Sequence, residues 1–266
     1  MVFYKALVKR GQIIESVHKA KYLVKDSKKI IALSTNNDDD LVYPRSSIKL
    51  FQAVPFVISN ASKKYQLNDK ILAIACSSHC GENFHIKVLS EWINKIKLPT
   101  KSLLCGIHNP ISAYSTNKLL LSGNMPSQLH NNCSGKHLAM LTGCLTNNLS
   151  QKNYVNFNHP YQKLIRDSLE FFTDLKIKKS WYGVDGCNAP QYCFPMNSLV
   201  NAMVKLANKK DSSNRYKIAS LKLLNAINKY PKLIGGTNRF DSEIIQITNG
   251  RIFCKGGAEG VLLFAD

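Results

Sequence analysis

A serine and a lysine lie three residues apart in the stretch PRSSIK at residues 44–49. On a helix, residues at this spacing share a face, so the amine of Lys49 can reach the hydroxyl of Ser46. A serine hydroxyl attacks an amide carbon well only when a base removes its proton. A lysine can be that base where burial or a second cation lowers its pKa. A helix-capping serine beside an exposed lysine gives the same short pattern, so other groups must decide between the two interpretations.

Three further segments place reactive side chains beside glycine, and each allows two interpretations. The stretch SSHCGE at residues 77–82 contains His79, which could act as a base or be structural. Cys133 and Cys187 could bind a soft metal such as zinc, but from their spacing alone two buried thiols in tight loops are the favoured interpretation. Lys255 precedes two glycines and could point into a cleft, or into solvent from a β-bulge.

Hydrophobic periodicity predicts the elements that must position these residues. Strands are expected at both ends of the chain, at residues 3–9, 12–24, 29–34, 250–254 and 259–265. Helices are expected between them, at about residues 46–64, 69–76, 82–96, 136–147, 159–173, 196–208, 214–229 and 240–247. Residues 97–132 are rich in turn-forming residues and are expected to be irregular. We therefore predict an α+β domain, in which the N- and C-terminal strands form one antiparallel sheet and the helices pack on it.

The composition is that of a globular protein with a basic surface. The chain of 266 residues is 44% hydrophobic, which is sufficient for the core of one large domain. Its formal net charge is +19, but the lysines are scattered, so a solvated basic surface is favoured over a nucleic-acid partner. No stretch approaches about 20 apolar residues and the N-terminus lacks the pattern of a signal peptide, so we expect no membrane partner and a cytoplasmic location. The eight cysteines are accordingly expected to be reduced thiols.

Five segments, taken in order along nearly the whole chain, resemble the asparaginase II family of thermolabile bacterial L-asparaginases. They are YPRSSIK at 43–49, SHCGE at 78–82, HNNCSGKH at 130–137, DGCNAP at 185–190 and KGGAEG at 255–260. The resemblance implies a fold similar to serine β-lactamases and penicillin-binding proteins, with residues 1–266 forming a single domain. It further implies a homodimer that hydrolyses the side-chain amide of L-asparagine to L-aspartate and ammonia, without an organic cofactor.

The resemblance also assigns roles to individual residues. Two Ser–Lys pairs are implied to be catalytic, namely Ser46 with Lys49 and Ser78 with Lys255. The expected substrate-binding residues are Asp185, Arg45 and His79. Asp185 would contact the α-ammonium group of the substrate. Arg45 could help at its α-carboxylate, but an exposed surface arginine fits the sequence at least as well. Which of the two serines carries the acyl group stays open.

A zinc site beside the active centre is implied by the same resemblance, with Cys133, Lys136 and Cys187 as ligands. A lysine must be neutral to bind a metal, so this requires a site that favours the neutral amine. The chain departs from the family pattern at Cys80, where another small residue is usual. It also ends at Asp266, whereas the family continues with another strand and a terminal helix, so we expect a domain shortened at its C-terminus.

Two classes of alternative function remain. A related serine amidohydrolase, such as a glutaminase or a β-lactam-reactive enzyme, would share the Ser–Lys chemistry, because one methylene in a substrate changes binding by only about 1–3 kcal/mol. A catalytically inactive zinc-binding or nucleic-acid-binding homologue would fit the shortened chain and the net charge of +19.

Overall fold

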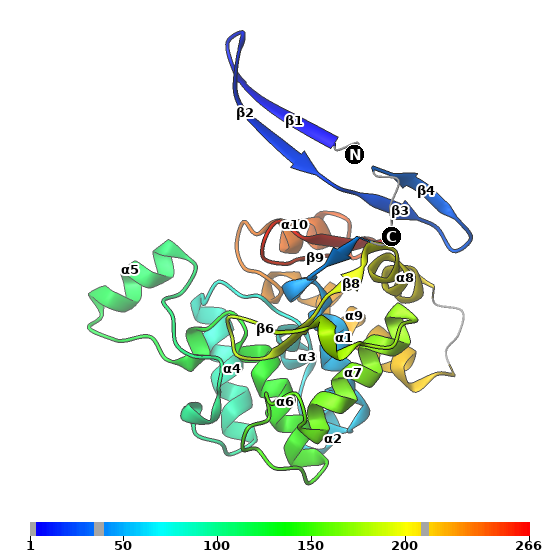
Figure 1. The fold of residues 1–266 in the computed structure, drawn as a ribbon. Helices are drawn as coiled ribbons and strands as arrows, with labels where there is room; N and C mark the ends of the chain where they lie inside the picture. Colours follow the sequence, from blue (N-terminus) through cyan, green and yellow to red (C-terminus); the bar gives the residue numbers. More distant parts are fainter. Residues whose placement is uncertain (1–3, 35–39, 209–212) are drawn as a thin grey trace.

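The computed structural model describes residues 4–34, 40–208 and 213–266. Its main body is a group of packed helices, from which a long hairpin projects (Figure 1). The helices are α1 Lys49–Ile58, α2 Ala61–Lys64, α3 Asp69–Ala75, α4 Asn83–Lys95, α5 Ala113–Leu121, α6 Ser134–Thr146, α7 Pro160–Thr173, α8 Met196–Ala207, α9 Arg215–Lys229 and α10 Phe240–Ile247. None of the helices within the described ranges is long and apolar enough to cross a membrane.

The strands form five antiparallel pairs. The strands are β1 Tyr4–Arg10, β2 Ile13–Ala20, β3 Leu23–Lys25, β4 Ile30–Leu33, β5 Leu41–Val42, β6 Tyr182–Val184, β7 Pro190–Tyr192, β8 Phe194–Pro195, β9 Phe253–Gly256 and β10 Leu262–Ala265. The pairs are β1–β2, β3–β4, β5–β8, β6–β7 and β9–β10. Helices and small antiparallel sheets together confirm the α+β class.

The prediction of one sheet built from both ends of the chain is wrong for the strands that the structure describes. β1, β3 and β9 each pair with the next strand in the sequence, because a short turn brings that neighbour back first. The hairpin of β1 and β2 also has no covered face: Leu7 is 48% exposed and Ile13 is 75% exposed.

The core is organised around α1. Its sequence, KLFQAVPFVI, is apolar on every side, which is the pattern of a helix enclosed by others. Only its last residue, Ile58, is not fully buried. α6, α7 and α9 pack against it, and α3 packs against α6 and α9. The start of α1 and the end of α3 therefore meet inside the molecule, where a buried polar group needs a partner.

Two glycines permit the close approaches that assemble this interior. A Cβ at Gly257 would lie 2.4 Å from the carbonyl oxygen of Pro44, so the end of β9 passes directly against the turn that carries Ser46. A Cβ at Gly135 would lie 2.1 Å from the carbonyl oxygen of Ile74, so the start of α6 touches the end of α3. No other residue type fits either contact without moving the backbone.

Most predicted helices of the core agree with the structure. The differences lie where a helix is interrupted or where a short helix was not predicted. The predicted helix at 240–247 has the same bounds as α10. The single helix predicted for residues 46–64 is a 3-10 turn at Arg45–Ile48 followed by α1 and α2, with a break at Asn60, whose φ is +59°. The region 97–132, predicted to be irregular, contains the short helix α5, whose nine residues include none that is buried.

Candidate active site

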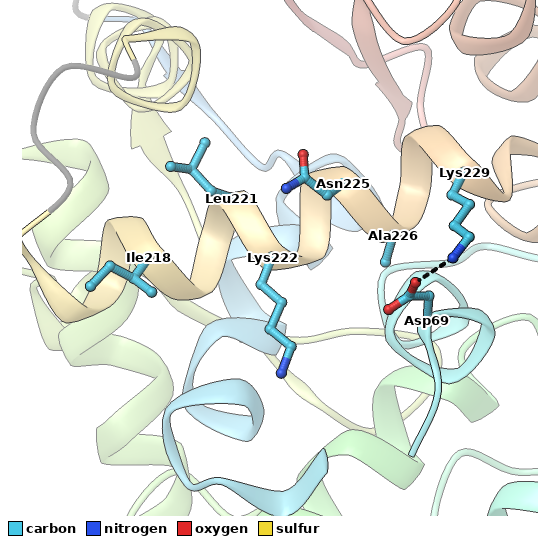
Figure 2. Close-up of a pocket in the computed structure, with 7 residues that line it drawn as sticks. All are labelled: Asp69, Ile218, Leu221, Lys222, Asn225, Ala226 and Lys229. Atoms are coloured by element: carbon cyan, nitrogen blue, oxygen red, sulfur yellow. Dashed lines mark hydrogen bonds and ion pairs between the residues drawn. The ribbon is translucent and has the colours of Figure 1, made fainter. Parts of the chain in front are cut away.

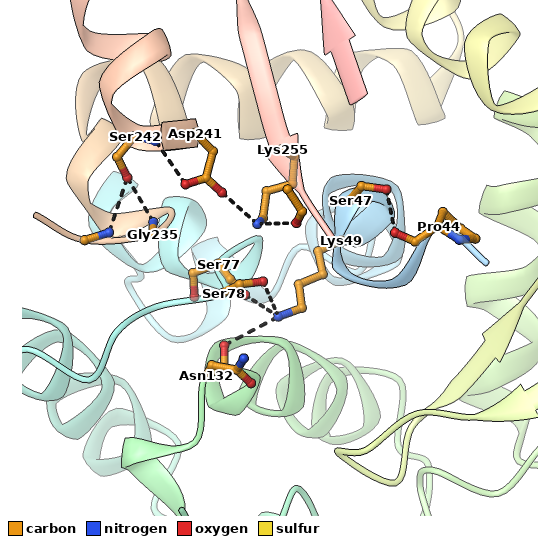
Figure 3. A network of polar contacts seen from close by, with 12 residues as sticks. Pro44, Ser47, Lys49, Ser77, Ser78, Asn132, Gly235, Asp241, Ser242 and Lys255 are labelled. Carbon is orange, nitrogen blue, oxygen red and sulfur yellow. Dashed lines mark hydrogen bonds and ion pairs between the residues drawn. The ribbon is translucent and has the colours of Figure 1, made fainter. Parts of the chain in front are cut away.

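Lys49 is the polar centre of the site, and its partner is Ser78. Its side chain enters the interior from the first turn of α1 and is 1% exposed. Its Nζ lies 3.0 Å from the hydroxyl of Ser78, 2.5 Å from the carbonyl oxygen of Ser77 and 3.4 Å from the carbonyl oxygen of Asn132 (Figure 3). No carboxylate within the described ranges forms an ion pair with it. The amine is therefore enclosed among neutral oxygens.

This environment favours the neutral amine. Burial lowers the pKa of Lys49, and the positive charges of Lys136 and Lys255 lower it further, against an opposing effect from Cys133. A neutral amine has two hydrogens and one lone pair, and here two carbonyls can accept the hydrogens. The lone pair is then left for the proton of the Ser78 hydroxyl, which is the geometry of a serine and its base.

Ser46 lies close to this centre but makes a different set of contacts. It is partly exposed in the 3-10 turn before α1, and in the part of the chain that the structure describes its hydroxyl makes no hydrogen bond. The expected Ser46–Lys49 pair is therefore not a direct contact. The side chain of Lys49 is directed toward the end of α3, where Ser77 and Ser78 lie.

Arg45 and Asp185 form a charged pair. The Nε and one terminal nitrogen of Arg45 donate to Oδ1 of Asp185, at 3.1 and 2.7 Å. Desolvation would raise the pKa of Asp185, but the positive charges of Lys136 and Arg45 outweigh it and hold the pKa below its usual value. Both residues line a pocket of about 600 Å³. Its other lining residues are Leu41, Val42, Tyr43, Gly183, Val184, Gln191, Glu259 and Val261.

Lys255, the second predicted catalytic lysine, is held by a carboxylate. It is 1% exposed, and its Nζ lies 3.0 Å from Oδ2 of Asp241 and 3.0 Å from the carbonyl oxygen of Gly256 (Figure 3). Desolvation would raise the pKa of Asp241, but the charge of Lys255 outweighs it and lowers the pKa. The implied Ser78–Lys255 pair is thus not a hydrogen-bonded pair here, because Lys49 contacts Ser78 and Asp241 contacts Lys255.

His79 is enclosed in the scaffold of the site and does not face the pocket. Its side chain is completely buried, its Nδ1 accepts the backbone N–H of Gly81 at 3.1 Å, and its Nε2 lies 2.8 Å from the hydroxyl of Ser134. Burial holds the pKa of His79 well below its usual value, so the ring is neutral and donates from Nε2. Both ring nitrogens have protein partners, which leaves no polar edge for the substrate contact that we expected of His79.

Cys133, Lys136 and Cys187 meet in one buried cluster. Nζ of Lys136 donates to Sγ of Cys187 at 3.1 Å. A hydrogen bond from Cys133 lowers the pKa of Cys187 to about 4, and the same bond raises the pKa of Cys133 to about 12. Burial lowers the pKa of Lys136, but the negative charge of Cys187 outweighs it, so the net shift is upward. Without a metal, the cluster is therefore a thiol, a thiolate and an ammonium group.

The donor set of this cluster suits zinc. Thiolate and amine donors are ligands that zinc accepts, and about 3.5 Å separates neighbouring N and S ligands around a tetrahedral zinc ion, near the 3.1 Å found here. In the metal-free cluster the pKa of Lys136 is raised, because the thiolate beside it favours the ammonium form. The neutral amine expected of a zinc-bound Lys136 stays a prediction. A search of the described residues for three or more His, Cys, Asp or Glu side chains around one metal position finds none, and this cluster contains only two such side chains.

A second hollow, of about 510 Å³, lies on the surface between α9 and the start of α3 (Figure 2). Its floor includes Ile218 and Leu221, and an ion pair of 2.9 Å between Asp69 and Lys229 crosses one end. None of the residues implicated by the sequence lines it. We therefore assign the chemistry to the Lys49 centre and not to this hollow.

Two features of the site were not foreseen from the sequence. The first feature is the carboxylate of Asp241, which pairs with the buried Lys255. Asp241 and Glu243 both lie in the first turn of α10, where acidic residues are common, so the sequence did not distinguish them. The second feature is the carbonyl oxygen of Asn132, which contacts Lys49 through the backbone. Residue type gives no signal for a backbone contact of this kind.

Two comparisons with known proteins bear on the family of the chain. A search among curated proteins finds no match. The family model described as L-asparaginase II matches residues 6–266, which is essentially the whole chain. The chain therefore belongs to the L-asparaginase II family.

Proposed function

We propose that this protein hydrolyses the side-chain amide of L-asparagine, with Lys49 as the base of a Ser–Lys centre. The observation that carries the proposal is the contact of 3.0 Å between the Lys49 amine and the Ser78 hydroxyl, in a buried setting that lowers the pKa of the amine. Family membership supplies the reaction class, an amidohydrolase. The contact between the amine and the hydroxyl supports an activated nucleophile of the kind that this class requires.

The reaction proceeds in two halves. Ser78 Oγ attacks the amide carbon while Lys49 takes the hydroxyl proton, and the same proton returns to the departing nitrogen as the C–N bond breaks, releasing ammonia. Water then attacks the acyl-enzyme ester, again losing a proton to Lys49, and L-aspartate leaves as Ser78 regains its hydrogen. Ser46 is the second candidate nucleophile, since it lies in the turn immediately before Lys49.

Substrate recognition is assigned to the Arg45–Asp185 pair. In the free protein the guanidinium and the carboxylate satisfy each other at 2.7 Å. The amino-acid end of asparagine carries the same two charges, so its carboxylate can bind Arg45 and its ammonium group can bind Asp185. Recognition of a zwitterion beside the serine fits a free amino acid better than a β-lactam, which lacks the α-ammonium group.

Zinc is part of the proposal, with Cys133, Lys136 and Cys187 as its ligands. When bound, it would supply a fixed positive charge and hold together the segments that carry these three residues. No step of the hydrolysis is assigned to the zinc site. We also propose a homodimer, on the basis of the family resemblance.

The decisive experiment measures ammonia release from L-asparagine by the wild type, Ser78→Ala and Ser46→Ala. We expect Ser78→Ala to lose nearly all activity, and Ser46→Ala to keep more of it. A panel with L-glutamine and a chromogenic β-lactam separates the related chemistries. Full activity in both alanine variants would rule out the Ser–Lys mechanism, and a wild type that is inactive on the whole panel would rule out the hydrolase assignment. Elemental analysis of the wild type and Cys133→Ala, purified with zinc, tests the metal site.

A further inference from the structure

Asp241 is the one carboxylate that the described interior places on a lysine of the candidate centre. Oδ2 lies 3.0 Å from Nζ of Lys255, and the two side chains are only 7% and 1% exposed. Oδ1 accepts the backbone N–H of Ser242 at 3.1 Å. A Cβ at Gly235 would lie 2.5 Å from the same Oδ1, so the neighbouring chain also fixes the position of the carboxylate.

We propose that Asp241 is a positioning residue of the hydrolase centre, which holds the ammonium group of Lys255 in place and keeps the positive charge there instead of on Lys49. The effect of Asp241 on ammonia release rests on the function proposed above. The charge arrangement itself does not, because it follows from the contacts of two buried lysines.

Without the Asp241 carboxylate, the two lysine amines would differ in the number of oxygen atoms that can accept their hydrogens. Lys49 has three oxygen acceptors, namely two carbonyls and the Ser78 hydroxyl. Lys255 then retains a single acceptor, the carbonyl oxygen of Gly256. Two buried ammonium groups repel each other, so a proton on one of the two amines disfavours a second proton on the other. Without the carboxylate, that proton is better accommodated on Lys49, which could then no longer act as a base.

The other charged and titratable groups around the pair are compatible with this assignment. Those acting on Lys49, besides Lys255, are Cys133, Lys136, Cys187, Cys76, His79 and His137. Those acting on Asp241 and Lys255 are Arg239, Cys76, Cys80 and Cys254. Burial raises the pKa of each of these last three thiols, so they are neutral near pH 7. Asp241 is thus the nearby negative charge that can hold the proton on Lys255.

The test is the pH profile of ammonia release by the full-length Asp241→Asn variant. We expect the acid limb of kcat/KM to move to higher pH by about one unit or more, with a loss of about tenfold or more at pH 7 and recovery at alkaline pH. Asp241→Glu keeps the negative charge and should return the limb toward its wild-type position. Asp69→Asn, which removes a surface carboxylate paired with Lys229, is the matched control and should leave the profile unchanged.

A readout independent of activity separates this inference from the proposed function. In protein labelled with 13Cε-lysine, with the Lys49 signal assigned through Lys49→Arg, we expect the titration midpoint of Lys49 to rise in Asp241→Asn. The rise would support the inference even if the wild type releases no ammonia, in which case only the proposed function fails. If Asp241→Asn does not fold, Asp241→Leu with Lys255→Met removes the pair without leaving an unpaired charge, and it should raise the same midpoint. An unmoved midpoint in a folded variant would overturn the inference.

Discussion

The two lysines of the centre are equally buried but have opposite kinds of partner. Lys49 lies among the oxygens of Ser77, Ser78 and Asn132, and Lys255 lies against the carboxylate of Asp241. A buried amine among neutral groups loses its proton easily, whereas an amine beside a carboxylate is held as an ion. Similar burial therefore gives the two lysines different roles, and the nearest charged atom decides which role each has.

The largest expected effect is the loss of activity in Lys49→Met. Removing the base should lower kcat/KM for L-asparagine by about 10³-fold, because a positioned general base contributes roughly 10²–10⁴-fold. Ammonia release measures it, with the surface variant Lys229→Met as control. Activity within a few fold of the wild type would show that Lys49 is not the base.

The same Lys49→Met variant should be more stable than the wild type. The pKa of Lys49 is lowered in the folded protein, so the unfolded chain binds more protons between that value and about 10.4. Lys49 therefore costs folding free energy below pH 10, and this cost grows as the pH falls toward the folded pKa. Urea unfolding of both proteins at pH 7 and pH 9 should show the gain, larger at pH 7.

Lys255→Met should change stability in the opposite direction. It leaves Asp241 buried without its cation, which typically costs about 3–5 kcal/mol. Adding Asp241→Leu should restore most of that loss, because an apolar pair of similar volume is often neutral. Urea unfolding of the single and double variants measures the difference. Equal stability of the wild type and Lys255→Met would show that the ion pair is not buried in solution.

A smaller effect, confined to recognition, is expected from Arg45→Lys. Lysine cannot reproduce the two contacts that Nε and the terminal nitrogen of Arg45 make with Asp185. We expect KM for L-asparagine to rise by about tenfold, the effect of losing roughly 1.5 kcal/mol from one charge-assisted hydrogen bond, with a much smaller change in kcat. A fall in kcat at constant KM would instead place Arg45 in the chemical step.

The smallest expected effect comes from the exposed pair of Asp69 and Lys229. Asp69→Asn removes an ion pair of 2.9 Å, yet surface pairs contribute only about 0–1 kcal/mol. Urea unfolding should therefore change by less than about 1 kcal/mol. A loss of stability as large as that of Lys255→Met would show that the exposed ion pair contributes as much as the buried pair of Asp241 and Lys255.

Much of the helical core follows from the sequence, because its apolar periodicity is strong. The bounds of α10 and the approximate bounds of α4, α6, α7 and α9 could all be predicted. β1 and β2 could be predicted as strands, but the strands with which they pair could not. Their apolar residues are exposed in the structure, yet the same residues would be expected in strands of a larger, covered sheet. Alternation alone does not say whether another layer covers the strand.

The sequence could predict candidate residues for the site, but not the partners that these residues have in the structure. The three-residue spacing predicts a contact between Lys49 and Ser46 along one helix. The structure has a 3-10 turn there, and Arg45 within it has a φ of +51°, so the regular helical geometry starts only at Lys49. The long lysine side chain then reaches across to the end of α3. Contacts of this kind depend on tertiary packing, which local spacing does not encode.

The contact between Gly257 and Pro44 joins two points that are separated by most of the chain. Closing so long a loop is entropically costly and slow relative to forming local helices. During synthesis, the turn that carries Ser46 leaves the ribosome long before β9 can cover it. The candidate centre is thus expected to assemble late, after β9 has been made and has docked against this turn.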